Sequence, residues 1–258
     1  MLLEIKNLNV TWGQGSRAAR ILDDVSLAVQ EGEIMALVGG SGSGKTTTGL
    51  AILRLMAPEL IMTAGQVIFK GTDLARIQES SLRDIRGKEI SMVFQEPLNA
   101  FNPVLTVGVQ ISEVLKVHTR IPSRRTLARV LELLDLVGIP DPARVAGEYP
   151  HRLSGGMRQR AMIAQAIAAE PQLVIADEPT SNIDVTLQAR ILELFRDLRQ
   201  KLGLSILLIT HDLGVVGHLT DRVAVMSGGR IVERGMTAQV LRDPQHAYTQ
   251  KLLEALKD

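Results

Sequence analysis

Hydrophobic and polar positions alternate near the start of the chain and later give way to continuous apolar runs. Residues 2–10 alternate as a half-buried strand does, and residues 25–29 repeat that alternation. Residues 34–38 form a short, wholly apolar run, and similar runs recur at residues 173–176 and 205–209. Runs of this kind are typical of strands that are covered on both faces. The pattern therefore predicts two strands with one face buried and one face exposed, followed by several strands that are buried on both faces.

Helical periodicity follows these buried runs. A glycine-rich loop separates the run at 34–38 from a helical pattern at residues 46–56, and residues 185–202 and 213–219 are amphipathic. Buried strands that alternate with helices predict an α/β layered domain with a largely parallel sheet.

Between about residues 98 and 160 the strand signal disappears. Residues 109–118 and 125–137 have helical patterns, and Pro140, Pro142 and Pro150 interrupt the chain afterwards. We expect residues 98–160 to be a helical subdomain inserted into a nucleotide-binding core made of residues 1–97 and 161–258.

Composition narrows the class of protein. The chain has 258 residues and 45% hydrophobic positions, enough to bury a sizeable core. Its 29 Lys plus Arg nearly balance its 28 Asp plus Glu, which argues against a nucleic-acid partner. It has no cysteine, which excludes disulfides and thiolate metal sites. The N-terminus lacks the apolar core of a signal peptide, and no apolar run reaches the roughly 18–20 residues of a bilayer span.

The glycine-rich loop matches the phosphate-binding pattern G-x-x-x-x-G-K-[ST]. Its glycines let backbone N–H groups converge on phosphate oxygens, and the following helix adds the positive end of its dipole. Lys45 can reach the β- and γ-phosphates, and the Thr46 hydroxyl can bind magnesium. A flexible glycine turn is the alternative, but it does not explain the placement between a buried strand and a helix. The candidate nucleotide-binding residues here are Gly39, Gly40, Ser41, Gly42, Ser43, Gly44, Lys45, Thr46 and Thr47.

Two adjacent carboxylates follow the buried run at 173–176. Asp177 is a candidate magnesium ligand, direct or through water, because ligands bind at the carboxyl ends of strands in open α/β sheets. Glu178 is then placed to orient or deprotonate an attacking water. By themselves these residues fit an ordinary acidic cap, and it is the phosphate loop that favours catalysis.

A second candidate anion site lies at residues 153–160. Ser154 is a good helix N-cap, and Gly155 and Gly156 would leave free N–H groups in the first turn. In isolation the favoured interpretation of this segment is an ordinary capped helix with an alanine-rich body.

These motifs, followed by Thr210-His211-Asp212, occur in one order and resemble the ATP-binding cassette (ABC) family of ATPases along essentially the whole chain. The resemblance implies a P-loop, RecA-like core with a mainly parallel sheet, an N-terminal antiparallel β subdomain and the inserted helical lobe. It also implies ATP and Mg²⁺ as ligands, and a head-to-tail dimer that holds each ATP between one subunit's phosphate loop and Ser154, Gly155 and Gly156 of the other.

The same resemblance assigns further roles. His211 would contact the γ-phosphate and the catalytic water, and Gln95 would link magnesium to the helical lobe. Trp12 would stack on adenine, although a lone Trp is more often a core residue. Asp184 matches the inter-subunit aspartate loop, within a segment, Ser181-Asn182-Ile183-Asp184, that departs from the commoner Ser-Ala-Leu-Asp.

Finer similarity points to the peptide and nickel importer group. Residues 94–103 and the tail segment 243–249 resemble the corresponding segments of that group. Peptide-importing members often continue into a cysteine-rich extension, whereas this chain has no cysteine, and residues 38–40 and 100–103 are closer to the nickel-type members. These details lean toward nickel, and the sequence leaves the choice between peptide and nickel undecided.

The group implies partners and a place in the cell. We expect transmembrane permease subunits, a second ABC ATPase subunit in a homo- or heterodimer, and an extracytoplasmic substrate-binding protein that acts indirectly. The chain would lie peripherally on the cytoplasmic face of the inner membrane. The alternatives are a soluble ABC ATPase of DNA repair or translation, or an exporter motor.

Overall fold

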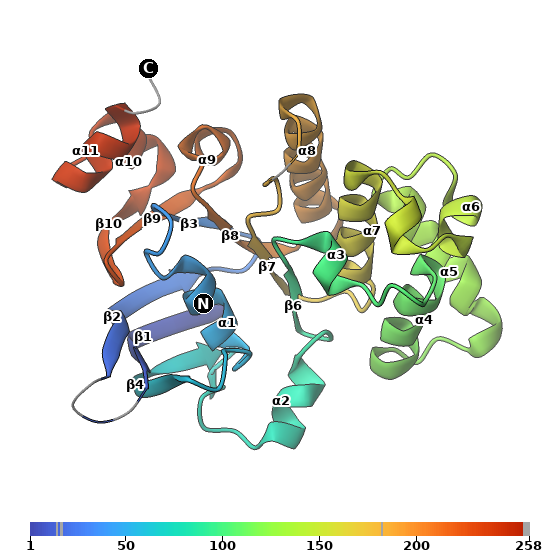
Figure 1. Cartoon of the computed structure of the whole chain (residues 1–258), viewed down its shortest axis with the longest axis horizontal. Coiled ribbons are helices and arrows are strands. Elements are labelled where there is room, and N and C mark those ends of the chain that lie inside the picture. The colour runs from blue at the N-terminus through green and yellow to red at the C-terminus, as the bar shows by residue number, and fades with distance from the viewer. Residues whose placement is uncertain (14, 16–17, 182, 255–258) are drawn as a thin grey trace. The chain divides into compact units, whose positions relative to one another are not determined.

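The computed structural model describes residues 1–13, 15, 18–181 and 183–254 (Figure 1). The chain forms two compact units. One contains Met1–Leu82 and Ser205–Asp258, and the other contains Arg83–Leu204. Among the described residues, no helix combines the length and apolar character that crossing a bilayer requires.

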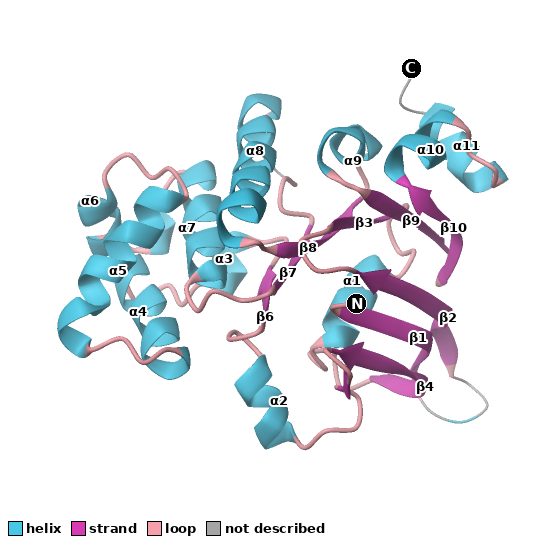
Figure 2. Ribbon diagram, turned by 180° about the vertical axis from the view of Figure 1, so that it is seen from behind, coloured by secondary structure: helices cyan, strands magenta, loops and turns pink. Residues whose placement is uncertain are grey.

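The first unit carries a four-stranded antiparallel sheet in the order β2-β1-β4-β5 (Figure 2). Its strands are β1 (Leu3–Trp12), β2 (Ala19–Val29), β4 (Leu60–Phe69) and β5 (Thr72–Asp73). Buried and more accessible positions alternate along β1 and β2, as expected for strands with one face on a core. The strands predicted at 2–10 and 25–29 are therefore confirmed.

The same unit contains strands in the order β10-β9-β3-β8. Here β3 (Ile34–Val38) pairs in parallel with both β8 (Ser205–Thr210) and β9 (Arg222–Ser227), and β10 (Arg230–Met236) pairs antiparallel with β9. Every residue of β3 and β8 is buried, which confirms the interpretation of the apolar runs.

Helices complete the first unit. Helix α1 (Lys45–Ile52) follows the glycine loop, and α9 (Leu213–Leu219) follows β8. Two short helices end the chain, α10 (Thr237–Arg242) and α11 (Ala247–Glu254). Side chains of α9 and α10 form one buried cluster with side chains of β3 and β9, and α11 packs against this cluster. Figure 1 shows these three helices at the same end of the unit as β9 and β10.

The second unit pairs two buried parallel strands with a group of helices. Strand β6 (Ile90–Val93) lies beside β7 (Leu173–Asp177), with Ile90 opposite Leu173 and Val93 opposite Ala176. The helices are α3 (Pro97–Ala100), α4 (Val107–His118), α5 (Ser123–Leu136), α6 (Pro142–Gly147), a 3-10 turn at Pro150–Arg152, α7 (Gly155–Ile167) and α8 (Val185–Leu202). Helix α2 (Glu79–Ile85) lies where the first unit passes into the second along the chain.

Helix α5 illustrates why this region folds as helices. Its Val130, Leu133 and Leu134 are buried at a spacing that places them on one helical face, while Arg124 and Arg125 are exposed. The helices predicted at 109–118 and 125–137 are confirmed as α4 and α5, each with slightly different bounds. The division of the chain at residues 98 and 160 stays a prediction.

Candidate functional site

The predicted phosphate-binding loop joins β3 to α1 within the first unit. Gly42 and Gly44 have positive φ angles of 73° and 105°, which glycine adopts without steric cost. A Cβ on Gly39 would lie 2.2 Å from the backbone oxygen of Met226, so no larger residue fits there. The local backbone thus requires glycines at the positions where a phosphate group needs close approach.

Lys45 folds back over the loop. Its Nζ donates hydrogen bonds of 2.9 Å to the carbonyl oxygens of Gly39 and of Gly40, and the residue is only 5% exposed. The ammonium group is therefore held within the concave loop rather than in solvent. Thr46, in contrast, is exposed at the start of α1, and Thr47 is half-buried.

His211 follows β8 in the same unit. Because Val38 is paired with Thr210 in the parallel register of β3 and β8, His211 and Gly39 leave the sheet at the same edge. The exposed His211 is followed by Asp212, whose side chain caps α9 by accepting hydrogen bonds from the N–H groups of Gly214 (2.8 Å) and Val215 (3.4 Å). Asp212 thus fixes the local turn that follows His211.

Trp12 lies at the end of β1 and is 51% exposed. It pairs with Ala19 of β2 and Leu60 of β4, so its backbone is fixed although its ring is accessible. Trp12 thus departs from the general tendency of a lone Trp to lie in a core, and its ring is accessible to a planar ligand.

Asp177 is the last residue of β7 in the second unit, and Glu178 follows it directly. Asp177 is 3% exposed, and Glu178 has a left-handed backbone with φ 45°. Such a conformation costs a non-glycine residue about 1–3 kcal/mol. Five other non-glycine residues of the described chain share it, so the backbone angle does not by itself mark a site. The amide Nε2 of Gln95 donates a hydrogen bond of 3.1 Å to Oε2 of Glu178. The structure thus brings together two of the predicted catalytic residues.

Ser154 caps α7 as the sequence predicts. Its Oγ accepts a hydrogen bond from Met157 N at 3.3 Å, and the side chain is exposed. A Cβ on Gly155 would meet no atom within 4 Å, whereas one on Gly156 would lie 2.4 Å from Cδ2 of Leu187. Gly156 therefore serves helix packing, and Gly155 leaves the helix N-terminus open to an anion.

Asp184 caps α8 in a similar way. Its Oδ1 accepts a hydrogen bond from Leu187 N at 2.9 Å, and the residue is exposed. This contact gives Asp184 a structural role in its own subunit in addition to the predicted inter-subunit one. Its neighbour Asn182 lies outside the described residues.

The predicted residues are thus divided between the two units. The first holds Trp12, the phosphate loop and His211, and the second holds Gln95, the segment 154–156, Asp177, Glu178 and Asp184. Sequence reasoning missed Tyr248, whose hydroxyl accepts a hydrogen bond of 2.9 Å from Gly40 N. No pattern within the sequence connects residues 208 positions apart.

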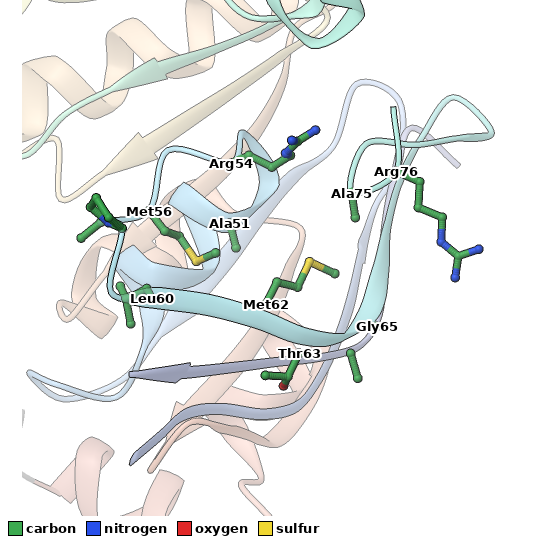
Figure 3. A pocket seen from close by; sticks show the side chains of 12 residues that line it. Ala51, Arg54, Met56, Leu60, Met62, Thr63, Gly65, Ala75 and Arg76 are labelled. Atoms are coloured by element: carbon green, nitrogen blue, oxygen red, sulfur yellow. The ribbon is translucent and has the colours of Figure 1, made fainter. Parts of the chain in front are cut away.

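A separate pocket of about 640 Å³ opens in the first unit, where the end of α1 faces β4 (Figure 3). None of the predicted site residues lines it. Its lining includes Ala51, Arg54, Met56, Leu60, Met62 and Arg76.

Comparison with known proteins establishes the family. Residues 22–181 match the ABC transporter family. A putative peptide import ATP-binding protein of Brucella ovis is 49% identical over 99% of this chain and 77% of its own length. The oligopeptide transport ATP-binding protein OppD of Bacillus subtilis is 46% identical over 99% of this chain and 72% of its own. The chain belongs to the ABC transporter family.

Solved structures agree with this assignment. The dimeric ATP-binding cassette MJ0796, in a post-hydrolysis state with ADP and Pi, superposes with a TM-score of 0.81 at 28% identity, covering 92% of this chain and 99% of that one. The protein cbiO1 of Clostridium perfringens, part of an ABC transporter complex, has a TM-score of 0.79 at 27% identity, covering 94% and 91%. The predicted ABC fold, with its antiparallel N-terminal sheet, is confirmed, and the chain is an ABC ATPase that binds and hydrolyses ATP.

Proposed function

We propose that this ABC ATPase is the motor subunit of an importer that takes up peptides. The observation that carries the proposal is the near-complete match to proteins named for peptide import, at 46–49% identity over 99% of the chain. These names favour peptide over the nickel cargo that the details of the sequence suggested, and they support import over export.

The phosphate loop supports nucleotide binding through its own geometry. The glycines with a left-handed backbone turn N–H groups toward the inside of the loop. Lys45 donates hydrogen bonds to two carbonyl oxygens of the loop, which hold its ammonium group at the concave side. In the proposed complex Lys45 transfers from these carbonyls to the β- and γ-phosphates. Trp12, accessible at the end of β1, stacks on the adenine.

Magnesium is proposed as the metal partner of ATP. Thr46, Gln95 and Asp177 supply neutral and anionic oxygen donors, which suit this hard cation, and the remaining ligands would be phosphate oxygens and water. Magnesium would neutralise charge on the β- and γ-phosphates during transfer.

Glu178 is the proposed general base. The hydrogen bond from Gln95 orients its carboxylate, and this carboxylate would orient the attacking water and accept its proton. His211, at the end of β8, is proposed to contact the γ-phosphate.

The partner subunit completes the site in this proposal. Ser154, Gly155 and Gly156 present a helix N-terminus that would bind the γ-phosphate of the facing subunit, with Asp184 near the dimer contact. ATP-driven closure of the dimer would then switch permease subunits between inward- and outward-facing states. We propose that residues 98–160 dock on those subunits, at the cytoplasmic face of the membrane, and that a binding protein outside delivers the peptide. The second ATPase is either an identical or a related chain.

An affinity purification tests this assembly. The tagged chain is isolated from membranes solubilised in mild detergent, and co-purifying proteins are identified by mass spectrometry, with a Lys45→Ala chain purified in parallel as a control for assembly without turnover. We expect multi-span permease subunits and a second cassette ATPase with both chains. Recovery of ribosomes or DNA-bound factors alone would contradict the importer and favour the soluble alternative.

A further inference from the structure

The C-terminal tail of the chain is fastened to β10 before it enters its last helix. The Glu233 carboxylate of β10 accepts hydrogen bonds from Gln245 N at 2.8 Å and from His246 N at 3.1 Å. His246 Nδ1 in turn accepts a hydrogen bond of 3.1 Å from Tyr248 N. These bonds fix where α11 begins, and with it the position of Tyr248 in its first turn.

The Tyr248 ring packs against the buried cluster beneath the phosphate loop. The cluster joins β3, β9, α9 and α10, and its members are Ala36, Val38, Leu213, Val216, Val223, Val225 and Val240. Because β3 runs directly into the loop, a ring on this cluster lies next to the point where the loop leaves the sheet.

The Tyr248 hydroxyl reaches the loop itself. Gly40 N–H donates to it at 2.9 Å, and a Cβ on Gly40 would lie 3.0 Å from the same oxygen. Gly40 N–H and Gly39 C=O belong to one trans peptide unit, in which the two groups point in opposite directions. Since Lys45 Nζ donates to that Gly39 carbonyl at 2.9 Å, two side chains hold a single peptide plane from opposite sides.

This arrangement has a consequence for ATP. A peptide between two glycines has little steric resistance to rotation, so its orientation depends on such partners. We propose that Tyr248 is a positioning residue for ATP binding, whose hydroxyl fixes the Gly39–Gly40 peptide and thereby the loop carbonyls that hold Lys45 ready for the phosphates. The proposal rests on the proposed role of Lys45 at the phosphates.

Tyr248→Phe tests the proposal, because it deletes the hydroxyl and keeps the ring on its cluster. We expect the Kd for MgATP, measured by titration calorimetry, and the KM of the assembled transporter to rise about three- to tenfold, the equilibrium value of one lost neutral hydrogen bond. The kcat at saturating ATP and the midpoint of thermal unfolding should stay close to wild type. Tyr149→Phe, the same deletion at the chain's other tyrosine, should leave the ATP affinity unchanged.

A double-mutant cycle tests whether the tail acts through this hydroxyl. Glu233→Ala, which frees the start of α11, should weaken MgATP binding in wild type and add little in the Tyr248→Phe background. Unchanged or tighter binding of MgATP by Tyr248→Phe, beside a wild type that binds normally, would overturn the positioning role alone. A wild-type chain that bound no MgATP would overturn both this role and the proposed nucleotide site.

Discussion

Several residues of the candidate site have a structural role in addition to the chemical role proposed for them. Ser154 and Asp184 each cap a helix, and Gly156 makes room for Leu187. Glu178 combines both kinds of contact, because its backbone oxygen accepts a hydrogen bond from Ser181 Oγ while its carboxylate accepts one from Gln95. At this scale the geometry favours chemistry most strongly at Glu178 and at Lys45.

His118 provides a residue-scale prediction away from that site. Burial lowers the pKa of His118 below its usual 6.5, and the charge of Lys88 lowers it further against the opposing effect of Asp84. The unfolded chain therefore binds a proton at His118 more readily than the folded chain, so the free energy of unfolding should fall as the pH drops below about 6.5. Urea unfolding at about pH 7.5, 6.5 and 5.5, which span the usual titration range of histidine, measures how the free energy of unfolding changes with pH. His118→Gln should reduce this pH dependence, and the control variant His151→Gln, at an exposed histidine, should not. The same pH dependence in the wild type and in both variants would contradict the prediction.

The elements owe their positions to close backbone contacts as well as to apolar patterns. Strands β1 and β4 pair with a register shift between Lys6 and Asn9, and Gly65 of β4 lies opposite this irregularity. A Cβ on Gly65 would be 2.5 Å from Asn7 O and 2.6 Å from Leu8 Cα, both backbone atoms that cannot move independently. The antiparallel sheet therefore depends on a glycine at this position.

Gly65→Ala tests that dependence at the scale of the element. Its φ of 101° and the backbone clash together should lower the free energy of unfolding by about 2–5 kcal/mol. Gly71→Ala is the matched control, since Gly71 also has a positive φ, 83°, but no atom within 4 Å of its Cβ position. It should cost only about 1–2 kcal/mol. If urea unfolding gave the same loss of free energy for both variants, backbone strain alone would explain the need for glycine at position 65, and the close contact between β1 and β4 would not contribute.

The elements also show what the sequence could and could not predict. The buried runs of β3, β7 and β8 and the amphipathic α8 and α9 were predictable from their patterns, because a single element produces each pattern. Strands β4, β6, β9 and β10 and the helices of the tail were not predicted, although β6 and β9 have apolar runs of their own. At the site, motifs predicted the loop and the strand-end carboxylates. The bonds from Gln95 to Glu178 and from Gly40 to Tyr248 join distant residues, and only the folded chain reveals them.

The proposed function requires the whole molecule to work within an assembly. Its units carry different parts of the predicted site, and in the proposed dimer a second subunit would provide the facing Ser154–Gly156 segment. An isolated monomer should accordingly hydrolyse ATP slowly, even when it is correctly folded. Tests of turnover therefore belong in the complete transporter.

Uptake by cells that carry Glu178→Gln in this chain, and lack other peptide importers, tests the central claim most directly. Labelled peptide and nickel are supplied separately, with Glu31→Gln, an exposed carboxylate in a turn, as the matched control. Because loss of a general base costs about 10²–10⁴-fold in rate, we predict that peptide uptake falls by about 10²-fold or more, while nickel uptake and the Glu31→Gln cells stay normal. Normal peptide uptake in the Glu178→Gln cells, or a loss of nickel uptake alone, would contradict the account.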